Sequence, residues 1–228
     1  SHMLRPLLVI SILCFSAPAV WGQGATGEPQ TPALPSVAEV TGALDRLYRS
    51  KTAQGTMTMD IVTRRYSRSL ELESWSRGEE QALIVIRSTA REAGTASLKT
   101  SDGLWSYAPR ADRLLRIPPG MLSDGWMGSH ISNDDLLRDS SWREDFETSL
   151  EEAKEGGRRV LKLTAIPKPN TPVVYSEIVW TVDAETLLPL RSEDFDGDRV
   201  ARTTTFDDVR DFGGRRLPSR ITVVPSKH

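Results

Sequence analysis

The sequence predicts a mainly β protein of about eleven antiparallel strands joined by short turns. Apolar and polar residues alternate with a period of two through most of the chain after residue 53. Turn signals containing glycine and aspartate separate these runs, and only two short stretches show helical spacing. Strands in this order form a sandwich, a barrel or one strongly curved sheet. A single curved sheet would have a concave apolar face, and the two helical stretches are the only elements available to cover it.

The first 35 residues resemble targeting and linker sequence. Ser1-His2 look like a cloning remnant, and residues 3–22 have the order of a secretory signal, because Arg5 precedes an apolar run too short to span a bilayer. Residues 23–35 are rich in glycine, proline, threonine and glutamine, which is typical of a flexible leader. We therefore expect a remnant and signal peptide at 1–22, a leader at 23–35 and a single domain at 36–228.

The only cysteine, Cys14, lies inside the predicted signal peptide. A lipid-attachment site would need small residues just before it, and Ile12-Leu13 do not provide them, so lipid anchoring at Cys14 is disfavoured. The mature chain then has no thiol for a disulfide, a zinc–thiolate site or nucleophilic catalysis. An exported chain without cysteine fits a bacterial periplasm better than a disulfide-stabilised secreted domain. We expect a periplasmic protein.

Charge and hydropathy argue against two large classes of function. The formal net charge of −2 is close to neutral for 228 residues, so a general nucleic-acid-binding surface is not indicated. Beyond the signal, no apolar run approaches the roughly 20 residues that a membrane-spanning helix needs. The remaining chain is long enough for one domain with a sizeable core.

An amphipathic helix is predicted over residues 37–49. Ser36 can cap it, with Glu39 at the capping-box position. Apolar residues then recur at helical spacing, namely Val37, Val40, Leu44, Leu47 and Tyr48. An isolated helix of this length is only marginally stable, so its apolar stripe must pack on another element.

The strands of the first half follow directly after this helix. Met57, Met59 and Ile61 alternate with polar residues from residue 53 onward. Further strands are expected at residues 70–75, 82–86, 96–98, 105–107 and 113–117. Turn signals between them are Arg77-Gly78, Ser101-Asp102-Gly103 and Ala111-Asp112.

The central segment, residues 118–138, combines large apolar side chains with glycines. Pro118-Pro119 end the preceding strand, because proline donates no hydrogen bond to a ladder. Ser132 can cap a short helix over 133–138, with Asp135 three residues on. Loops are usually polar, so this segment either plugs an ordinary core or forms a movable lid over a cavity for an apolar ligand. Methionine and tryptophan suit a surface that must repack around flexible chains. The large residues are Met121, Leu122, Trp126 and Met127.

The second half repeats the pattern of short strands and turns. Strands are predicted at residues 143–153, 161–165, 178–182, 200–209 and 217–224. Asp183 to Thr186 form a turn, after which Leu188 and Leu190 alternate, and Asp196-Gly197 is a strong hairpin signal.

The candidate ligand-binding set consists of large apolar residues on the expected inner strand faces and in the central segment. These residues could be packed core, or they could line a cavity that two helices are too small to fill. The set is Met57, Met59, Ile61, Leu70, Leu72, Ile84, Leu115, Ile117, Met121, Leu122, Trp126, Met127, Trp180 and Val182.

From about Leu44 to its end, the chain resembles the outer-membrane lipoprotein-sorting, or LolA-like, protein family. The segments that carry the resemblance are AGTASLKTSDGLWSYAPRADRLLRIPPGM, WMGSHISNDDL, LPLRSEDFDGD and FDDVRDFGGRRLPSRI. The resemblance implies an incomplete, strongly curved antiparallel β-barrel, covered by the N-terminal helix and the short central helix and loop around a hydrophobic cavity. Members of the family carry the acylated end of lipoproteins across the periplasm, relatives bind other lipids or act as sensors, and one branch is catalytic.

The sequence contains no pattern that matches a known catalytic or metal-binding motif. Ser129, His130 and Asp134 are close in sequence but match no nucleophile elbow or triad arrangement. The aspartates around Gly197 suggest a calcium loop, but the glycine comes too early and no bidentate glutamate follows, so a hairpin turn is favoured. The basic pair Arg64-Arg65 serves solubility or contacts headgroups or an acidic partner. We predict no catalytic residue, no metal and no cofactor.

The sequence and the resemblance together predict a monomeric, non-catalytic periplasmic carrier or acceptor. It would bind the acyl chains of a lipoprotein or a free lipid in outer-membrane trafficking, with an inner-membrane transporter as a further candidate partner and no nucleic acid. The alternative is a lipid-sensing or partner-binding periplasmic subunit of a membrane export machine. An enzyme on a borrowed fold ranks last, because the strand faces show few polar groups that could converge in a cavity.

Overall fold

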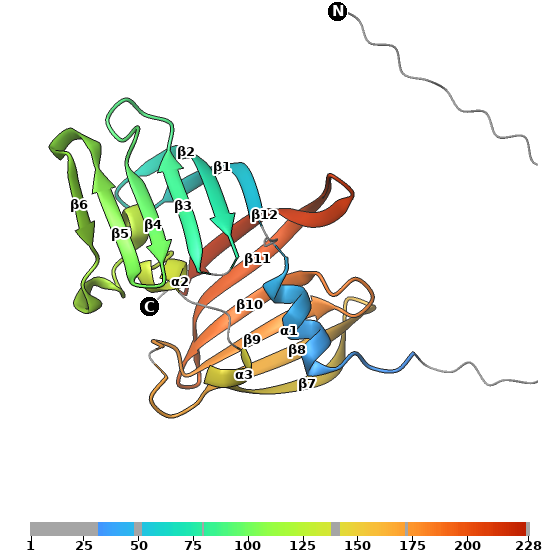
Figure 1. The fold of residues 1–228 in the computed structure, drawn as a ribbon. Coiled ribbons are helices and arrows are strands. Elements are labelled where there is room, and N and C mark those ends of the chain that lie inside the picture. The colour runs from blue at the N-terminus through green and yellow to red at the C-terminus, as the bar shows by residue number, and fades with distance from the viewer. Residues whose placement is uncertain (1–31, 48–51, 79, 138–141, 172, 227–228) are drawn as a thin grey trace, which may run out of the picture. The chain divides into compact units, whose positions relative to one another are not determined.

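Twelve β-strands and three α-helices make up the residues that the computed structural model describes, which are 32–47, 52–78, 80–137, 142–171 and 173–226 (Figure 1). The expectation of a mainly β protein is therefore confirmed. Residues 34–228 form one compact unit. The predicted signal peptide and most of the predicted leader lie outside the described residues.

The first sheet is an antiparallel meander in which each strand pairs with the next along the chain. Alternation predicted these strands because a sheet with one buried face requires a period of two. The predicted turns at Arg77-Gly78 and Ser101-Asp102-Gly103 are confirmed, since they lie between paired strands. The strands are β1 (Thr52–Val62), β2 (Ser67–Arg77), β3 (Gln81–Ile86), β4 (Ala96–Thr100), β5 (Gly103–Ala108) and β6 (Arg113–Arg116).

Short helical pieces follow β6 instead of another strand. They are the 3₁₀ helices η2 (Pro119–Met121) and η3 (Trp126–Gly128) and the α-helices α2 (Asn133–Leu137) and α3 (Trp142–Asp145), while η1 (Pro109–Ala111) lies earlier, between β5 and β6. The predicted cap of α2 is confirmed, because Asp135 N–H donates to Ser132 Oγ at 3.0 Å and Ser132 N–H donates to the Asp135 carboxylate at 2.8 Å. Residues 143–145 were predicted as strand but belong to α3. The alternation there was weak, and local helical geometry prevails.

The second sheet is also an antiparallel meander, with the order β12-β11-β10-β9-β8-β7. The predicted hairpin at Asp196-Gly197 is confirmed as the turn between β10 and β11, with a register shift just before it. The strands are β7 (Phe146–Glu155), β8 (Arg158–Pro167), β9 (Glu177–Asp183), β10 (Pro189–Asp196), β11 (Arg199–Phe212) and β12 (Arg215–Pro225).

Helix α1 (Val37–Asp45) packs on the second sheet. Ser36 and Glu39 form the predicted capping box, with Ser36 N–H donating to the Glu39 carboxylate at 2.7 Å. Val40 is fully buried in a cluster with residues of β8 and β9, and Val37 and Leu44 pack beside it. The apolar stripe therefore stabilises the helix through tertiary contact, as its marginal intrinsic stability requires.

The prediction of one curved sheet of about eleven strands is corrected. The described residues form twelve strands in two six-stranded sheets, and neither sheet closes on itself. The physical reason lies after β6, where Pro118 and Pro119 stop the ladder and the chain turns into helical pieces that add no strand to either sheet. Among the described residues, none of the helices has the length and apolar composition that crossing a bilayer demands.

Candidate functional site

One face of the first sheet gathers six of the fourteen residues of the predicted apolar set. The register pairs Met57 with Leu72 and Met59 with Leu70, and Leu72 in turn with Ile86. Residues directly opposite in antiparallel strands share a face, so these side chains form one surface. We call it the apolar face, and it consists of Met57, Met59, Ile61, Leu70, Leu72, Ile84 and Ile86.

The apolar face is covered unevenly. Ile61, Leu70 and Leu72 are at most 3% exposed, whereas Met57, in the middle of β1 and last in the apolar row from Ile61, is 51% exposed. Trp126 of η3 covers the buried part and is itself 6% exposed, with Met127 and Leu136 packed beside it. The central segment thus covers one end of the face and leaves the other open to solvent.

Hydrogen bonds fix the tryptophan in this position. Its indole Nε1–H donates to Ser97 Oγ of β4 at 2.9 Å, and its backbone N–H donates to the Ile131 carbonyl at 2.6 Å. The Ser129 hydroxyl donates to the Trp126 carbonyl at 2.6 Å. A buried indole needs such a partner, so Ser97 specifies tryptophan at this position rather than another large apolar residue.

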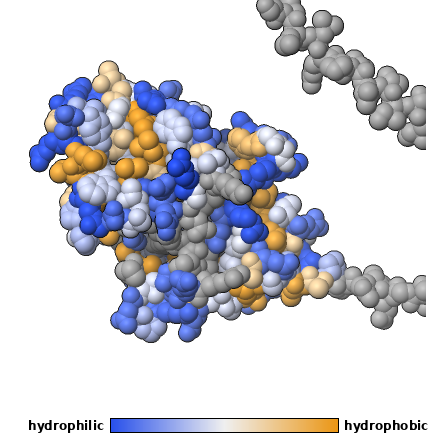
Figure 2. Space-filling view, viewed as in Figure 1, coloured by the Kyte–Doolittle hydropathy of each residue, from blue (hydrophilic) through white to orange (hydrophobic). Residues whose placement is uncertain are grey.

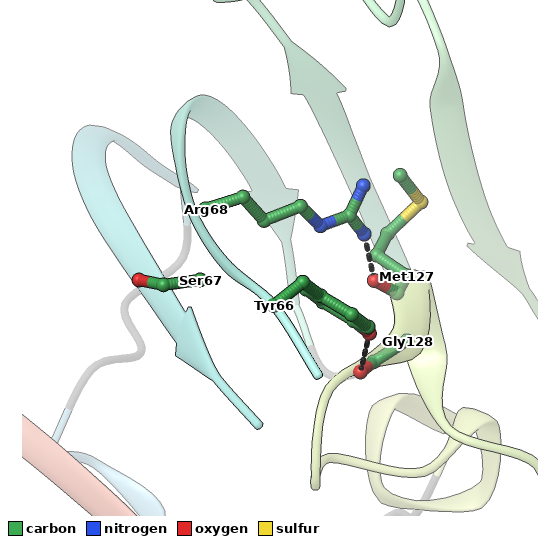
Figure 3. A pocket seen from close by; sticks show the side chains of 5 residues that line it. All are labelled: Tyr66, Ser67, Arg68, Met127 and Gly128. Carbon is green, nitrogen blue, oxygen red and sulfur yellow. Dashed lines mark hydrogen bonds between the residues drawn. The ribbon is translucent and has the colours of Figure 1, made fainter. Parts of the chain in front are cut away.

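Two residues at the start of β2 bind the backbone of the central segment from the side (Figure 3). The Tyr66 hydroxyl donates to the Gly128 carbonyl at 2.9 Å. The Arg68 guanidinium donates to the Met127 carbonyl and forms an ion pair with Glu92. Arg68 lies on the same face of β2 as Leu70 and Leu72, since alternate residues share a face. A cation therefore stands at the covered end of the apolar face.

A shallow pocket of about 400 Å³ lies where these groups meet. Its lining is Tyr66, Ser67, Arg68, Met127 and Gly128 (Figure 3). Arg68 Nε is buried and has no hydrogen-bond partner among the described residues, which leaves one donor of the guanidinium unused.

The backbone at Met127 and Gly128 is left-handed, with φ of 53° and 71°. This conformation is costly for a residue with a side chain and free for glycine. A Cβ on Gly128 would also lie 2.7 Å from the Tyr66 hydroxyl. Glycine at 128 is therefore required both by the turn and by the close approach of Tyr66.

A second anchor joins the central segment to the second sheet. The Arg202 guanidinium of β11 contacts the carboxylates of Asp135 at 2.6 Å and Asp194 at 2.7 Å, and it donates to the His130 carbonyl at 3.1 Å. Burial alone would lower the pKa of Arg202, but the hydrogen bond to Asp135 and the charge of Asp194 raise it above its usual value. The network therefore holds a permanent cation between two carboxylates.

The structure separates the remaining predicted residues. Trp180 and Val182 lie on β9, where they pack in the clusters of the second sheet rather than with the apolar face. Leu115 shares the side of the first sheet on which Ser97 lies, but it is 52% exposed, as is Met121 at 46%. Ile117 and Leu122 are partly buried.

Sequence reasoning missed Tyr66, Arg68 and Ser97. A signal for Arg68 was present, because the alternation of β2 places this charged residue on the apolar side, in phase with Leu70 and Leu72. Tyr66 and Ser97 left no such signal, since their contacts are made with residues 62 and 29 positions away in the chain.

Three solved structures share this fold over most of their lengths. A DUF1329 family protein from Desulfovibrio piger matches with a TM-score of 0.72 and 22% identity, over 82% of this chain and 84% of that one. An outer membrane lipoprotein-sorting protein domain, from Vibrio parahaemolyticus, gives 0.69 and 22%, over 82% and 83%. A LolA superfamily protein from Nitrosomonas europaea gives 0.67 and 17%, over 85% and 87%.

Comparison at the level of sequence gives one further finding. A family model described as that of an uncharacterized protein matches residues 78–228, which is most of the chain. No match was found among curated proteins. Since the family model and the shared fold agree with the resemblance of the motifs, the chain belongs to the LolA-like family.

Proposed function

We propose that this protein is a non-catalytic periplasmic carrier or acceptor that binds acyl chains of a lipoprotein or a free lipid on the apolar face. One observation carries the proposal: the apolar face is covered by a glycine-hinged segment at one end and exposes Met57 at the other. Core packing alone does not explain why a methionine at the end of a continuous apolar row is half exposed to water. The similarity of its fold to an outer membrane lipoprotein-sorting protein domain and to a LolA superfamily protein supports the same ligand class.

The energetics of acyl chains explain what such a protein must provide. Each buried CH₂ group contributes about 0.8 kcal/mol, so moving one sixteen-carbon chain into water costs about 13 kcal/mol. A carrier must offer a comparable apolar surface and still release its ligand. Methionine and tryptophan side chains over a flexible connection satisfy both demands better than rigid aliphatic packing.

We infer that the central segment and the acyl chain would occupy the apolar face in turn. Trp126 covers Ile61, Leu70 and Leu72, and an acyl chain entering from the Met57 side would replace it. The hydrogen bonds from Tyr66 and Arg68 to the segment end on backbone carbonyls, and displacing Trp126 must also break its hydrogen bond to Ser97. Gly125 and Gly128 flank the tryptophan and supply the hinges.

The proposal is tested at the open end of the apolar face. Met57→Glu places a charge where the acyl chain would enter, and we expect uptake of a fluorescent fatty acid to weaken at least tenfold. Met57 is half exposed, so the β-signal in circular dichroism should stay unchanged. Thr56→Glu is the matched control, because Thr56 is an exposed neighbour on the opposite side of the strand. Equal uptake by both variants would contradict the proposal.

A second candidate function is favoured by the burial of Trp126. If this side chain fills the apolar face permanently, the protein would be a lipid-sensing or partner-binding subunit of an export machine. Native mass spectrometry of protein purified without detergent separates the two. A bound species with acyl chains supports the carrier, whereas protein that stays empty after incubation with acylated peptide and phospholipid vesicles supports the subunit.

A further inference from the structure

The edge strand β6 and the turn after it expose large apolar side chains in a short stretch of chain. Leu114 is 56%, Leu115 52% and Met121 46% exposed. β6 is the last strand of its sheet, and among the described residues it pairs with β5 alone. Figure 2 shows apolar surface interspersed with polar surface over this sheet. Single exposed apolar residues are ordinary, but three within eight residues at a sheet edge are a liability unless something covers them.

Positive charge accompanies these apolar residues. Residues 103–121 contain three arginines and a single acidic residue, Asp112, whereas the whole chain carries a net charge of −2. Arg110 and Arg113 are exposed and make no ion pair with any described residue. Arg116 donates to the Asp102 carbonyl, which holds its guanidinium beside the strand. Arginines alone would protect an edge from pairing, but protection does not require exposed leucines between them.

Aromatic residues complete the surface on the neighbouring strand. Trp105 of β5 lies opposite Arg116, and Tyr107 lies opposite Leu114, so both aromatics share a face with Arg116 and Leu114, while Arg113 and Leu115 lie on the other face of the edge strand. The Tyr107 hydroxyl donates to the Asp112 carboxylate at 3.0 Å. Tryptophan and tyrosine beside arginine are typical of surfaces that sit at the headgroup level of a bilayer.

We propose that residues 110–121 dock the protein onto a membrane surface that displays anionic phospholipid headgroups. With the edge of the sheet toward the bilayer, the arginines would bind phosphate, while Leu114 and Leu115, from the two faces of β6, and Met121 would enter the region below the headgroups. The inference rests on the proposed function for its purpose, because a carrier of acyl chains must approach a bilayer. The docked edge leads directly into the central segment. Docking would therefore bring this segment, which covers the apolar face, next to the lipid.

The first experiment reports on the edge itself. A bimane label is attached to Leu114→Cys in a full chain that also carries Cys14→Ser, and vesicles of phosphatidylcholine with phosphatidylglycerol are added. We expect the emission to shift to shorter wavelength as the label leaves water. The control label is Val224→Cys on β12, which replaces a side chain that is equally exposed, at 55%. Equal shifts at both positions, or no shift at 114, would overturn the proposal.

The second experiment measures the contribution of charge. The double variant Arg110→Gln/Arg113→Gln should bind anionic vesicles about 25-fold more weakly, since one arginine near such a surface is worth about fivefold in affinity. The control Arg64→Gln/Arg65→Gln removes the same charge from the β1–β2 turn and should change affinity much less. Equal losses in both double variants would overturn docking at this edge.

Two further outcomes distinguish membrane docking from self-association of the chain and from the proposed carrier function. A shift of the label at 114 that depends on protein concentration and needs no vesicles would assign β6 to pairing between two copies of the chain instead. Fatty-acid uptake without membranes tests the proposed function alone. Loss of vesicle binding with intact uptake therefore concerns docking, and loss of uptake with intact vesicle binding concerns the apolar face.

Discussion

At the scale of single residues, Gly128 is in close contact with Tyr66, the residue just before β2. We expect Gly128→Ala to lower the free energy of unfolding by about 1–2 kcal/mol, because alanine is strained at a φ of 71° and its Cβ would lie 2.7 Å from the Tyr66 hydroxyl. Urea denaturation measures the change. Gly120→Ala is the control, since a Cβ there meets nothing within 4 Å, and an equal loss in this variant would remove the argument.

Trp126 and Ser97 form a second residue-scale unit. Trp126→Phe keeps most of the apolar contact but leaves the buried Ser97 hydroxyl without its indole donor, which should cost about 1–3 kcal/mol. Ser97→Ala removes the other partner. If the hydrogen bond holds the segment, the double variant will be more stable than the sum of the two losses predicts. Additive losses in urea denaturation would mean that the bond contributes nothing.

At the scale of elements, charged side chains tie together strands that are not neighbours. Glu155 at the end of β7 receives two hydrogen bonds from Arg191 of β10, at 2.6 and 2.7 Å, and Lys162 of β8 lies 3.4 Å away. The hydrogen bonds from Arg191 outweigh the effect of burial and lower the pKa of Glu155 from 4.5 to about 2. The group links β7, β8 and β10 across the polar side of the second sheet.

This link predicts a dependence of stability on pH. Because the folded state holds the pKa of Glu155 below its unfolded value, its contribution is complete above about pH 4.5 and is lost as the pH falls to about 2. A third of the side chain is exposed, so screening limits the contribution to about 1 kcal/mol. Glu155→Gln should therefore differ from the unmodified protein at pH 7 and match it near pH 2.

Urea midpoints measured between pH 7 and pH 2 test this prediction. Glu147→Gln on the same strand is the control, because Glu147 has no ion pair among the described residues. A difference for Glu155→Gln that stays constant down to pH 2 would show that the pair does not titrate as its geometry implies.

At the scale of the whole molecule, Arg202 connects the central segment to the second sheet. Removing it takes an ion-pair partner from Asp194, which is 4% exposed, and from Asp135. Arg202→Met should cost about 3–5 kcal/mol in the free energy of unfolding, and adding Asp194→Asn should restore part of it. The control Arg220→Met breaks a pair in which the arginine is 65% exposed, so it should cost less than about 1 kcal/mol. Similar losses in both single variants would contradict a central role for Arg202.

Local chemistry explains which parts of the fold the sequence could predict. The caps at Ser36 and Ser132 were predicted because each closes a hydrogen-bonded ring within three residues. The strands were predicted because alternation is a property of the strand itself. Residues 143–145 were assigned wrongly because a weak alternation cannot exclude one helical turn.

The sequence by itself determined the strands, the two caps, the turns and the family to which the chain belongs. Only the tertiary structure decided that the strands divide into two sheets, that Trp180 lies apart from Met59 and Trp126, and that Arg68 and Tyr66 bind the central segment. The physical reason is the separation in sequence over which each interaction acts. Alternation and capping act between residues a few positions apart, whereas the face that a strand presents to another element depends on register and packing between segments that are far apart in the chain.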